Sequence, residues 1–217
     1  MESIQKHLND ELPENSSELP KVKWPVMSGD YALGSMSECP VAIATIASEI
    51  RINSELFSIM GSVKTENLGV ERVIANVIAN PNIRFLIICG KESQGHCTAQ
   101  TIKELMKSGI DEKKRVIGSK GAFPYIENVP REGIERFRKQ VEIVDLVGEE
   151  SAEKIESTAR SCISRNPGSF GEPFVFLEVE EEMGEAKGIP ENSVLIYGDV
   201  LYDYERSVVY VSEESKA

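Results

Sequence analysis

The feature that most constrains the fold is the segment Ile83 to Cys89, seven residues of which only Arg84 is polar. A strand that is apolar at consecutive positions has to be buried on both faces, and such strands lie at the centre of parallel sheets covered by helices on both sides. Gly90 ends the segment. The segment therefore predicts a central strand of an α/β domain.

Helical patterns flank this strand on both sides. The preceding pattern has apolar residues at the i, i+3, i+4, i+7 and i+8 positions of one helix face, namely Val70, Val73, Ile74, Val77 and Ile78. Asn80-Pro81 ends that helix, because proline disfavours helical geometry in the residue before it. A second helix follows the strand, with apolar positions at Ala99, Ile102, Leu105 and Met106 and a terminating Gly109.

The remaining patterns continue this alternation. Val41 to Ile46 reads as a buried strand, with helix as the competing interpretation. Arg115 to Gly118 and Val141 to Val147 read as further strands. Helices are predicted from Pro130 to about Gln140 and over residues 150–165. Together they predict a Rossmann-like, mostly parallel sheet with helices on both faces.

The two ends of the chain differ from this middle part. Residues 1–21 form a polar N-terminal arm. Near the C-terminus, strand-like segments follow one another without helices between them, at Phe174–Val179, Ser193–Tyr197 and Val208–Val211. We therefore predict an α/β domain over residues 22–170 and a small antiparallel β extension over residues 171–217.

Composition restricts the class of function. The net charge is −12, and no uninterrupted basic stripe is present to bind phosphates, so nucleic acid is not an expected partner. None of the four cysteines forms a Cys-x-x-Cys pair, and no apolar run approaches the roughly 20 residues that span a bilayer. Without a secretory signal, the expected location is the cytoplasm.

Ligands of open parallel sheets bind at the carboxyl ends of the strands. Two glycine-containing loops have this position, one from Gly90 to His96 and one from Gly118 to Pro124. Their candidate ligand-binding residues are Gly90, Ser93, Gln94, Gly95 and His96 in the first loop, and Gly118, Gly121, Ala122 and Pro124 in the second.

His96 is the candidate for metal chemistry because a neutral imidazole is a good ligand for transition metals. The only other histidine is His7, so a site with several histidine ligands is excluded, but one histidine is enough when a cofactor brings its own equatorial ligands. Gln94 could orient the imidazole or meet a polar edge of the ligand. An ordinary surface histidine is the alternative. The first loop lacks the Lys-Ser/Thr pair of a P-loop, which argues against nucleotide binding.

Thr65-Glu66-Asn67 precedes the first of the two helices. Helix capping by Thr65 or Asn67 is the simpler interpretation of this segment, and participation in the ligand site is the other.

Several blocks of the sequence resemble the corrinoid-binding subunit, MtrA, of the methanogen tetrahydromethanopterin S-methyltransferase complex. They are Trp24-Pro25-Val26 with Gly29-Asp30-Tyr31 and Pro40-Val41-Ala42, then Gly61 to Gly69, and then Asn80 to Phe85 followed by Gln94-Gly95-His96. The resemblance extends from about residue 22 to about residue 170.

The resemblance implies a function that the spacing of residues does not. MtrA carries a cobamide (5-hydroxybenzimidazolylcobamide or cobalamin), and the residue that matches His96 is the lower axial ligand of cobalt. Methyl-tetrahydromethanopterin methylates the cobalt, coenzyme M accepts the methyl group, and the full membrane complex couples this transfer to sodium export. The implied partners are the other subunits of that complex. Thr65, Glu66 and Asn67 join the cofactor-binding candidates through the resemblance.

Two differences from the family limit which of its properties can be expected of this chain. Gly34-Ser35-Met36 stands where the family has Gly-Asn-Pro. Family members usually end in a membrane anchor, and no such segment is present in these 217 residues. We therefore expect a truncated form, or a soluble corrinoid-binding paralogue that meets the membrane only through partners. A third possibility is an α/β module that binds another small molecule.

Overall fold

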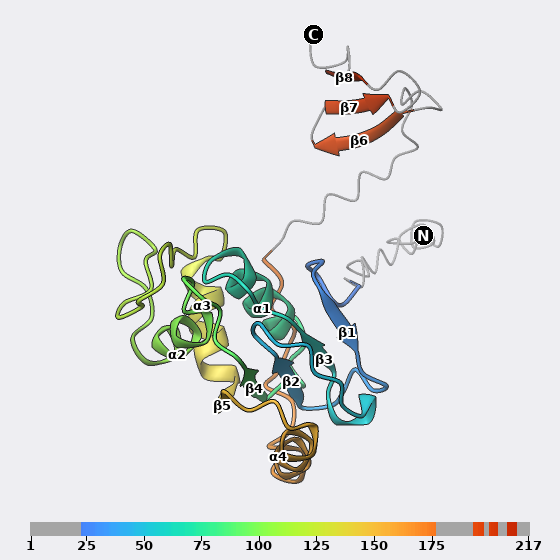
Figure 1. Cartoon of the computed structure of the whole chain (residues 1–217), viewed down its shortest axis with the longest axis vertical. Helices are drawn as coiled ribbons and strands as arrows, with labels where there is room; N and C mark the ends of the chain where they lie inside the picture. The colour runs from blue at the N-terminus through green and yellow to red at the C-terminus, as the bar shows by residue number, and fades with distance from the viewer. Residues whose placement is uncertain (1–22, 177–192, 198–199, 204–207, 212–217) are drawn as a thin grey trace, which may run out of the picture. The chain divides into compact units, whose positions relative to one another are not determined.

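A computed structural model describes residues 23–176, 193–197, 200–203 and 208–211 (Figure 1). The chain divides into two compact units, Met1–Leu177 and Glu178–Ala217. The first unit holds a five-stranded sheet with the strand order β1-β3-β2-β4-β5. Strands β3, β2, β4 and β5 are parallel to one another, and β1 pairs antiparallel with β3. The predicted α/β fold with a mostly parallel sheet is confirmed.

The two central strands are β2 (Val41–Ala44) and β4 (Phe85–Gly90), and every residue of both is buried. Val41 pairs with Phe85, and the register continues to Ala44 opposite Ile88. On its other side β4 pairs with β5 (Glu142–Val147). The apolar segment therefore forms the central strand that its sequence predicts.

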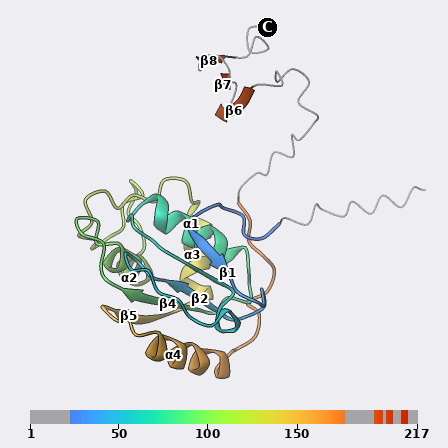
Figure 2. The same cartoon turned by 45° about the vertical axis from the view of Figure 1, so that its right-hand side comes forward.

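Helices cover both faces of this sheet (Figures 1 and 2). One face packs against α1 (Leu68–Ile78), α2 (Thr98–Ser108) and α3 (Arg131–Gln140). The other face packs against α4 (Ala152–Ser164) and the 3-10 turn η1 (Ser54–Leu56). Because side chains alternate along a strand, Ala42, Ala44, Leu86 and Ile88 enter the first core, whereas Val41, Ile43, Phe85 and Ile87 enter the second.

The edge formed by β1 (Tyr31–Leu33) and β3 (Ile59–Gly61) is not among the predicted strands. The segment around Tyr31 reads as a turn in the sequence, and residues 56–62 as an ambiguous apolar stretch. In the structure the two segments pair, with Tyr31 opposite Gly61 and Leu33 opposite Ile59. A strand of three residues carries too little local pattern to be recognised without its distant partner.

The predicted strand at Arg115 to Gly118 is wrong. The segment forms only isolated bridges, between Ile110 and Val116 and between Arg115 and Tyr125. The position beside β4 is taken by β5, and this segment is not one of the five strands of the sheet. Val116 is fully buried and packs into the core as part of a loop.

The second unit contains a three-stranded antiparallel sheet of β6 (Ser193–Tyr197), β7 (Val200–Asp203) and β8 (Val208–Val211). The strands predicted at Ser193–Tyr197 and Val208–Val211 are confirmed, and β7 lies between them. Of the strand predicted at Phe174–Val179, residues 174–176 are not in a strand and residues 177–179 lie outside the described residues. No described helix is both long and apolar enough to cross a membrane.

Candidate functional site

The candidate site lies at the carboxyl ends of β3 and β4, the strands on either side of β2. The segment that leaves β3 carries Lys64, Thr65 and Glu66 toward α1, and the segment that leaves β4 carries Ser93 and His96 toward α2. The Ser93 hydroxyl is buried and donates a hydrogen bond of 2.6 Å to the Lys64 carbonyl, which joins the two segments. Parallel strands thus bring together residues that are some 30 positions apart in sequence.

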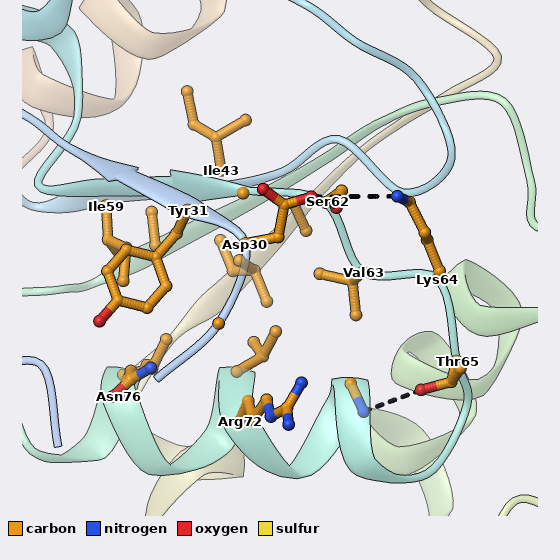
Figure 3. Close-up of a pocket in the computed structure, with 18 residues that line it drawn as sticks. Asp30, Tyr31, Ile43, Ile59, Ser62, Val63, Lys64, Thr65, Arg72 and Asn76 are labelled. Carbon is orange, nitrogen blue, oxygen red and sulfur yellow. Dashed lines mark hydrogen bonds and ion pairs between the residues drawn. The ribbon is translucent and has the colours of Figure 1, made fainter. Parts of the chain in front are cut away.

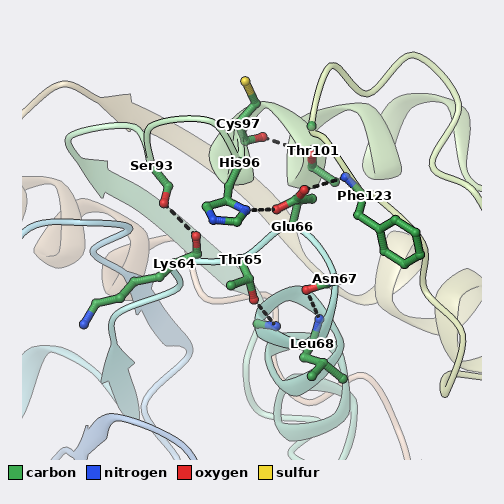
Figure 4. Close-up of polar contacts among 12 residues, drawn as sticks. Lys64, Thr65, Glu66, Asn67, Leu68, Ser93, His96, Cys97, Thr101 and Phe123 are labelled. Atoms are coloured by element: carbon green, nitrogen blue, oxygen red, sulfur yellow. Dashed lines mark hydrogen bonds and ion pairs between the residues drawn. The ribbon is translucent and has the colours of Figure 1, made fainter.

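The imidazole of His96 contacts the carboxylate of Glu66 (Figure 4). The distance from Nδ1 of His96 to Oε2 of Glu66 is 2.6 Å. The Glu66 side chain is 1% exposed, whereas that of His96 is 47% exposed. One end of this pair is therefore fixed in the protein and the other reaches the surface.

The Glu66 carboxylate is fixed by a second hydrogen bond. Its Oε1 accepts the backbone N–H of Phe123 at 2.7 Å. Burial disfavours the charged form, but the hydrogen bonds from the Phe123 amide, from the amide of Glu66 itself and from His96 together hold the Glu66 pKa below its usual range. Glu66 is therefore a buried carboxylate that stays ionised.

This geometry determines which nitrogen of His96 can bind a ligand. An ionised carboxylate only accepts hydrogen bonds, so Nδ1 carries the hydrogen. In a neutral imidazole the lone pair is then on Nε2. Within the part of the chain that the structure describes, no group hydrogen-bonds to Nε2. Figure 4 shows Nε2 on the side of the ring away from Glu66.

The second predicted loop packs over this pair although no strand precedes it. Helix α2 holds the loop through Gln100, which bonds the Gly118 carbonyl and the Lys120 amide, and through Thr101, whose hydroxyl lies 2.7 Å from that of Ser119. A Cβ on Gly121 would lie 2.6 Å from the His96 carbonyl and 2.8 Å from Cγ of Glu66. Only glycine allows the loop to approach this closely.

Comparison with known proteins identifies the family of this chain. Residues 17–187 match the family model MtrA, which describes the A subunit of tetrahydromethanopterin S-methyltransferase. The chain belongs to this family. The match confirms the predicted family and the predicted class of enzyme, a methyltransferase subunit.

Three relatives, all named as A subunits of tetrahydromethanopterin S-methyltransferase, illustrate the range of similarity. The A 1 form from Methanothermobacter marburgensis is 51% identical over 172 residues, which is 78% of this chain and 72% of the relative. The protein from Methanosphaera stadtmanae is 41% identical over 204 residues, or 89% of this chain and 81% of the relative. The A 2 form from Methanothermobacter marburgensis is 45% identical over 170 residues, or 76% of this chain and 90% of the relative.

In this member of the MtrA family, the other residues predicted to bind the cofactor differ in where they lie relative to His96 and Glu66. Thr65 and Asn67 cap α1, since their side chains accept the amides of Gly69 and Leu68. Gln94 is exposed, and the residue that orients the imidazole is Glu66. Gly95 has a positive φ of 78°, and a Cβ there would meet nothing within 4 Å.

Three more of the predicted residues lie around the pair. Gly90 lies at the end of β4, where a Cβ would lie 2.3 Å from the Thr45 carbonyl. The Pro124 carbonyl accepts the Val116 amide. Ala122 is exposed beside Gly121.

Glu92 is a residue that sequence reasoning missed. Its carboxylate accepts the amides of Ala99 and Gln100 at 3.0 Å each, in the first turn of α2. A helix N-terminus attracts anions, and here the protein supplies the anion itself. This end of α2 is therefore already occupied by a carboxylate and is poorly suited to bind a phosphate.

The structure also contains a cavity that the sequence did not suggest (Figure 3). It has a volume of about 220 Å³ and lies between the sheet and α1. The one available sequence signal is the pair of small residues, Ala42 and Ala44, in a strand otherwise made of large ones.

The described residues contain no group of three or more His, Cys, Asp or Glu side chains that could hold a bare metal ion. Among them, His96 is the one histidine, and its imidazole is the candidate donor to a metal. That donor suits a metal whose remaining ligands come from a cofactor.

Proposed function

We propose that this chain is the cobamide-carrying subunit of a methyltransferase that moves a methyl group from methyl-tetrahydromethanopterin to coenzyme M. The observation that carries the proposal is the hydrogen bond between His96 and the buried, ionised Glu66. Membership of the MtrA family supports the methyl donor, which is part of the relatives' name. The other subunits of the complex are the proposed partners, and sodium export is the proposed consequence in the full complex.

The site would offer a corrinoid one imidazole nitrogen as a ligand for its cobalt. Nε2 of His96 would be the cobalt ligand, and Glu66 would hold the proton on Nδ1. A carboxylate behind a metal-bound histidine fixes the tautomer and makes the ring a stronger donor. When bound, the corrinoid supplies a nucleophilic metal that accepts a methyl group and passes it on.

The surrounding residues control how firmly the imidazole is held. The Phe123 amide fixes Glu66, and Gly121 lets the second loop close over the pair. The exposed side of His96 leaves room for a large cofactor at the surface. The Glu66 side of the pair is therefore fixed, and the exposed His96 ring is the part that would meet the cofactor.

Corrinoid binding is tested by mixing the purified chain with cobalamin and recording the visible spectrum. Displacement of the cofactor's own base by His96 changes the absorption bands. We expect a saturable change with a 1:1 end point. A spectrum identical to that of free cobalamin at all protein concentrations would contradict the proposal.

A second candidate function is a corrinoid-binding paralogue outside the sodium-pumping complex. The relatives from Methanothermobacter marburgensis favour considering it, because that organism has both an A 1 and an A 2 form similar to this chain. Co-purification with the membrane subunits and methyl transfer to coenzyme M in a reconstituted assay support the first function. Corrinoid binding without either result supports the second.

A further inference from the structure

The segment of residues 113–126, which includes the loop over the His96–Glu66 pair, differs in charge from the rest of the chain. It has no acidic residue, although the whole chain has a net charge of −12. Its four basic residues are Lys113, Lys114, Arg115 and Lys120. Within the described ranges none of these four side chains forms an ion pair. The segment is therefore a local positive surface on an acidic protein.

The same segment exposes apolar side chains beside these charges. Ile117 is 45% exposed and Phe123 is 54% exposed. The buried Val116 donates its amide to the carbonyl of the buried Pro124, so the two exposed residues each lie one position from the same hydrogen bond. The Tyr125 ring extends this apolar surface, with its centroid 4.7 Å from that of Phe123. We call these three side chains, together with the four basic ones, the outer face.

Hydrogen bonds hold the outer face in one conformation. The carboxylate of Asp111 accepts the amides of Lys113 and Arg115 at 2.8 and 2.9 Å. Gln100 on α2 bonds the Gly118 carbonyl and the Lys120 amide. Single exposed apolar residues are common on proteins, but an apolar cluster that is rimmed by polar groups is typical of an interaction surface. A surface that is already ordered also loses little conformational entropy when a partner binds.

The outer face adjoins the proposed cofactor site. The Phe123 amide donates to Oε1 of Glu66 at 2.7 Å, whereas the Phe123 ring points away from the His96–Glu66 pair (Figure 4). The exposed ring is therefore directed toward a neighbour other than the group that His96 would bind. A protein that binds the outer face meets this chain next to the proposed cobalt ligand.

We propose that the outer face binds another subunit of the methyltransferase complex, through an apolar surface bordered by carboxylates. Ile117, Phe123 and Tyr125 would fill the apolar centre of this interface, and the basic side chains would select a partner with an acidic rim. The position beside His96 favours a subunit of the complex, since a methyl carrier has to meet the proteins that hold the donor and the acceptor. The proposal rests on the proposed function, which makes the other subunits partners of this chain.

Photo-crosslinking tests the proposal in the assembled complex. Benzoylphenylalanine, a photoreactive analogue of phenylalanine, replaces Phe123 in the full chain, which is produced together with the other subunits. The matched control carries the analogue in place of Met36, which is 55% exposed and lies just after β1. We expect position 123, but not position 36, to crosslink to another subunit, as identified by mass spectrometry of the purified complex. Equal crosslinking at the two positions, or crosslinks from position 123 only to a second copy of this chain, would overturn the proposal.

Binding measurements separate the outer face from the cofactor site. Ile117→Ser should weaken binding of the full chain to the other subunits by about tenfold, and Met36→Ser should leave it unchanged. Lys113→Glu should weaken it as well, compared with Lys139→Glu at an exposed position of α3. All four variants should bind cobalamin with wild-type affinity in a visible titration, which also shows that they are folded. Loss of cobalamin binding in Ile117→Ser would assign the outer face to the cofactor site and overturn the proposal.

A lipid surface is distinguished by sedimentation with phosphatidylglycerol vesicles, because basic and apolar side chains together also suit an anionic membrane. Sedimentation of wild type that Ile117→Ser abolishes would overturn the assignment to a protein partner. Wild-type binding of Ile117→Ser to the other subunits would overturn this inference while the proposed function stands. A wild-type chain that joins none of the other subunits would overturn the proposed partners, and this inference with them.

Discussion

At the scale of single residues, Glu66 determines what His96 can do. Replacing Glu66 by Gln keeps an oxygen for the Phe123 amide, but the carboxamide nitrogen then faces Nδ1 of His96 and donates to it. Nδ1 becomes an acceptor and the ring hydrogen moves to Nε2. The nitrogen proposed to bind cobalt would lose its lone pair.

Glu66→Gln should therefore weaken cobalamin binding by about 10- to 100-fold, the usual effect of losing a hydrogen-bonding partner of a metal ligand. Visible titration measures this affinity. The matched control is Glu71→Gln, because Glu71 is also a buried carboxylate and bonds the amide and side chain of Asn128. Equal losses of affinity in the two variants would show that Glu66 has only a structural role.

The ionisation of Glu66 also makes the site sensitive to pH. The Glu66 pKa lies below its ordinary value of about 4.3, so its ionised form stabilises the fold above that pH. This contribution is lost as the pH falls through the lowered pKa of the folded state.

We therefore expect the difference in unfolding free energy between wild type and Glu66→Gln to be largest at neutral pH and to shrink below about pH 4. Urea denaturation at a series of pH values measures it. A difference that is independent of pH would contradict the assignment of an ionised carboxylate.

At the scale of elements, the start of α1 connects the fold to the site. The Thr65 hydroxyl accepts the Gly69 amide at 3.0 Å, so it caps the helix one residue before Glu66. Thr65→Val should lower the unfolding free energy by about 1 kcal/mol, the typical value of a lost cap. Thr65→Ser keeps the oxygen and should be close to wild type in the same urea titration. Equal stability of the valine and serine variants would rule out a capping role.

The elements differ in how far the sequence predicts them. The segment at Ile83 to Cys89 and the periodic helix from Val70 to Ile78 are recognisable because each repeats its pattern over several residues. The prediction of a strand at Arg115 to Gly118 was wrong, because local apolar character cannot show whether a segment pairs with the sheet. Strand β1 was missed because its pairing partner β3 is about 30 residues away.

The candidate site, like the elements, could be predicted from the sequence only in part. The position of His96 after a buried strand follows from the sequence, and so does the capping role of the segment before α1. The contact between His96 and Glu66 does not, because it depends on how two loops from different strands meet. The cavity depends on the packing of β2 against α1, which the small residues Ala42 and Ala44 only hint at.

At the scale of the whole molecule, the chain separates into two units at Leu177 and Glu178. The segment before this point belongs to the first unit, since the Phe170 amide bonds the Pro81 carbonyl and the Phe174 amide bonds the Ile78 carbonyl. We propose Leu177 as the end of the corrinoid-binding domain. The residues of the site all lie within this unit.

A chain ending at Leu177 should therefore bind cobalamin with the affinity and spectrum of the full chain. Its thermal unfolding, followed by circular dichroism, should show the same main transition. Loss of corrinoid binding in a shortened chain that still unfolds cooperatively would show that the second unit contributes to the site.

The most direct test of the account is electron paramagnetic resonance of the bound corrinoid in its cobalt(II) state. Wild-type chain containing ordinary histidine should show splitting of the signal by one axial nitrogen. Chain labelled with the heavy nitrogen isotope only in histidine should change this splitting from a triplet to a doublet, and His96→Ala should abolish the histidine-derived splitting. A splitting that neither the labelling nor the substitution alters would show that His96 does not bind the cobalt.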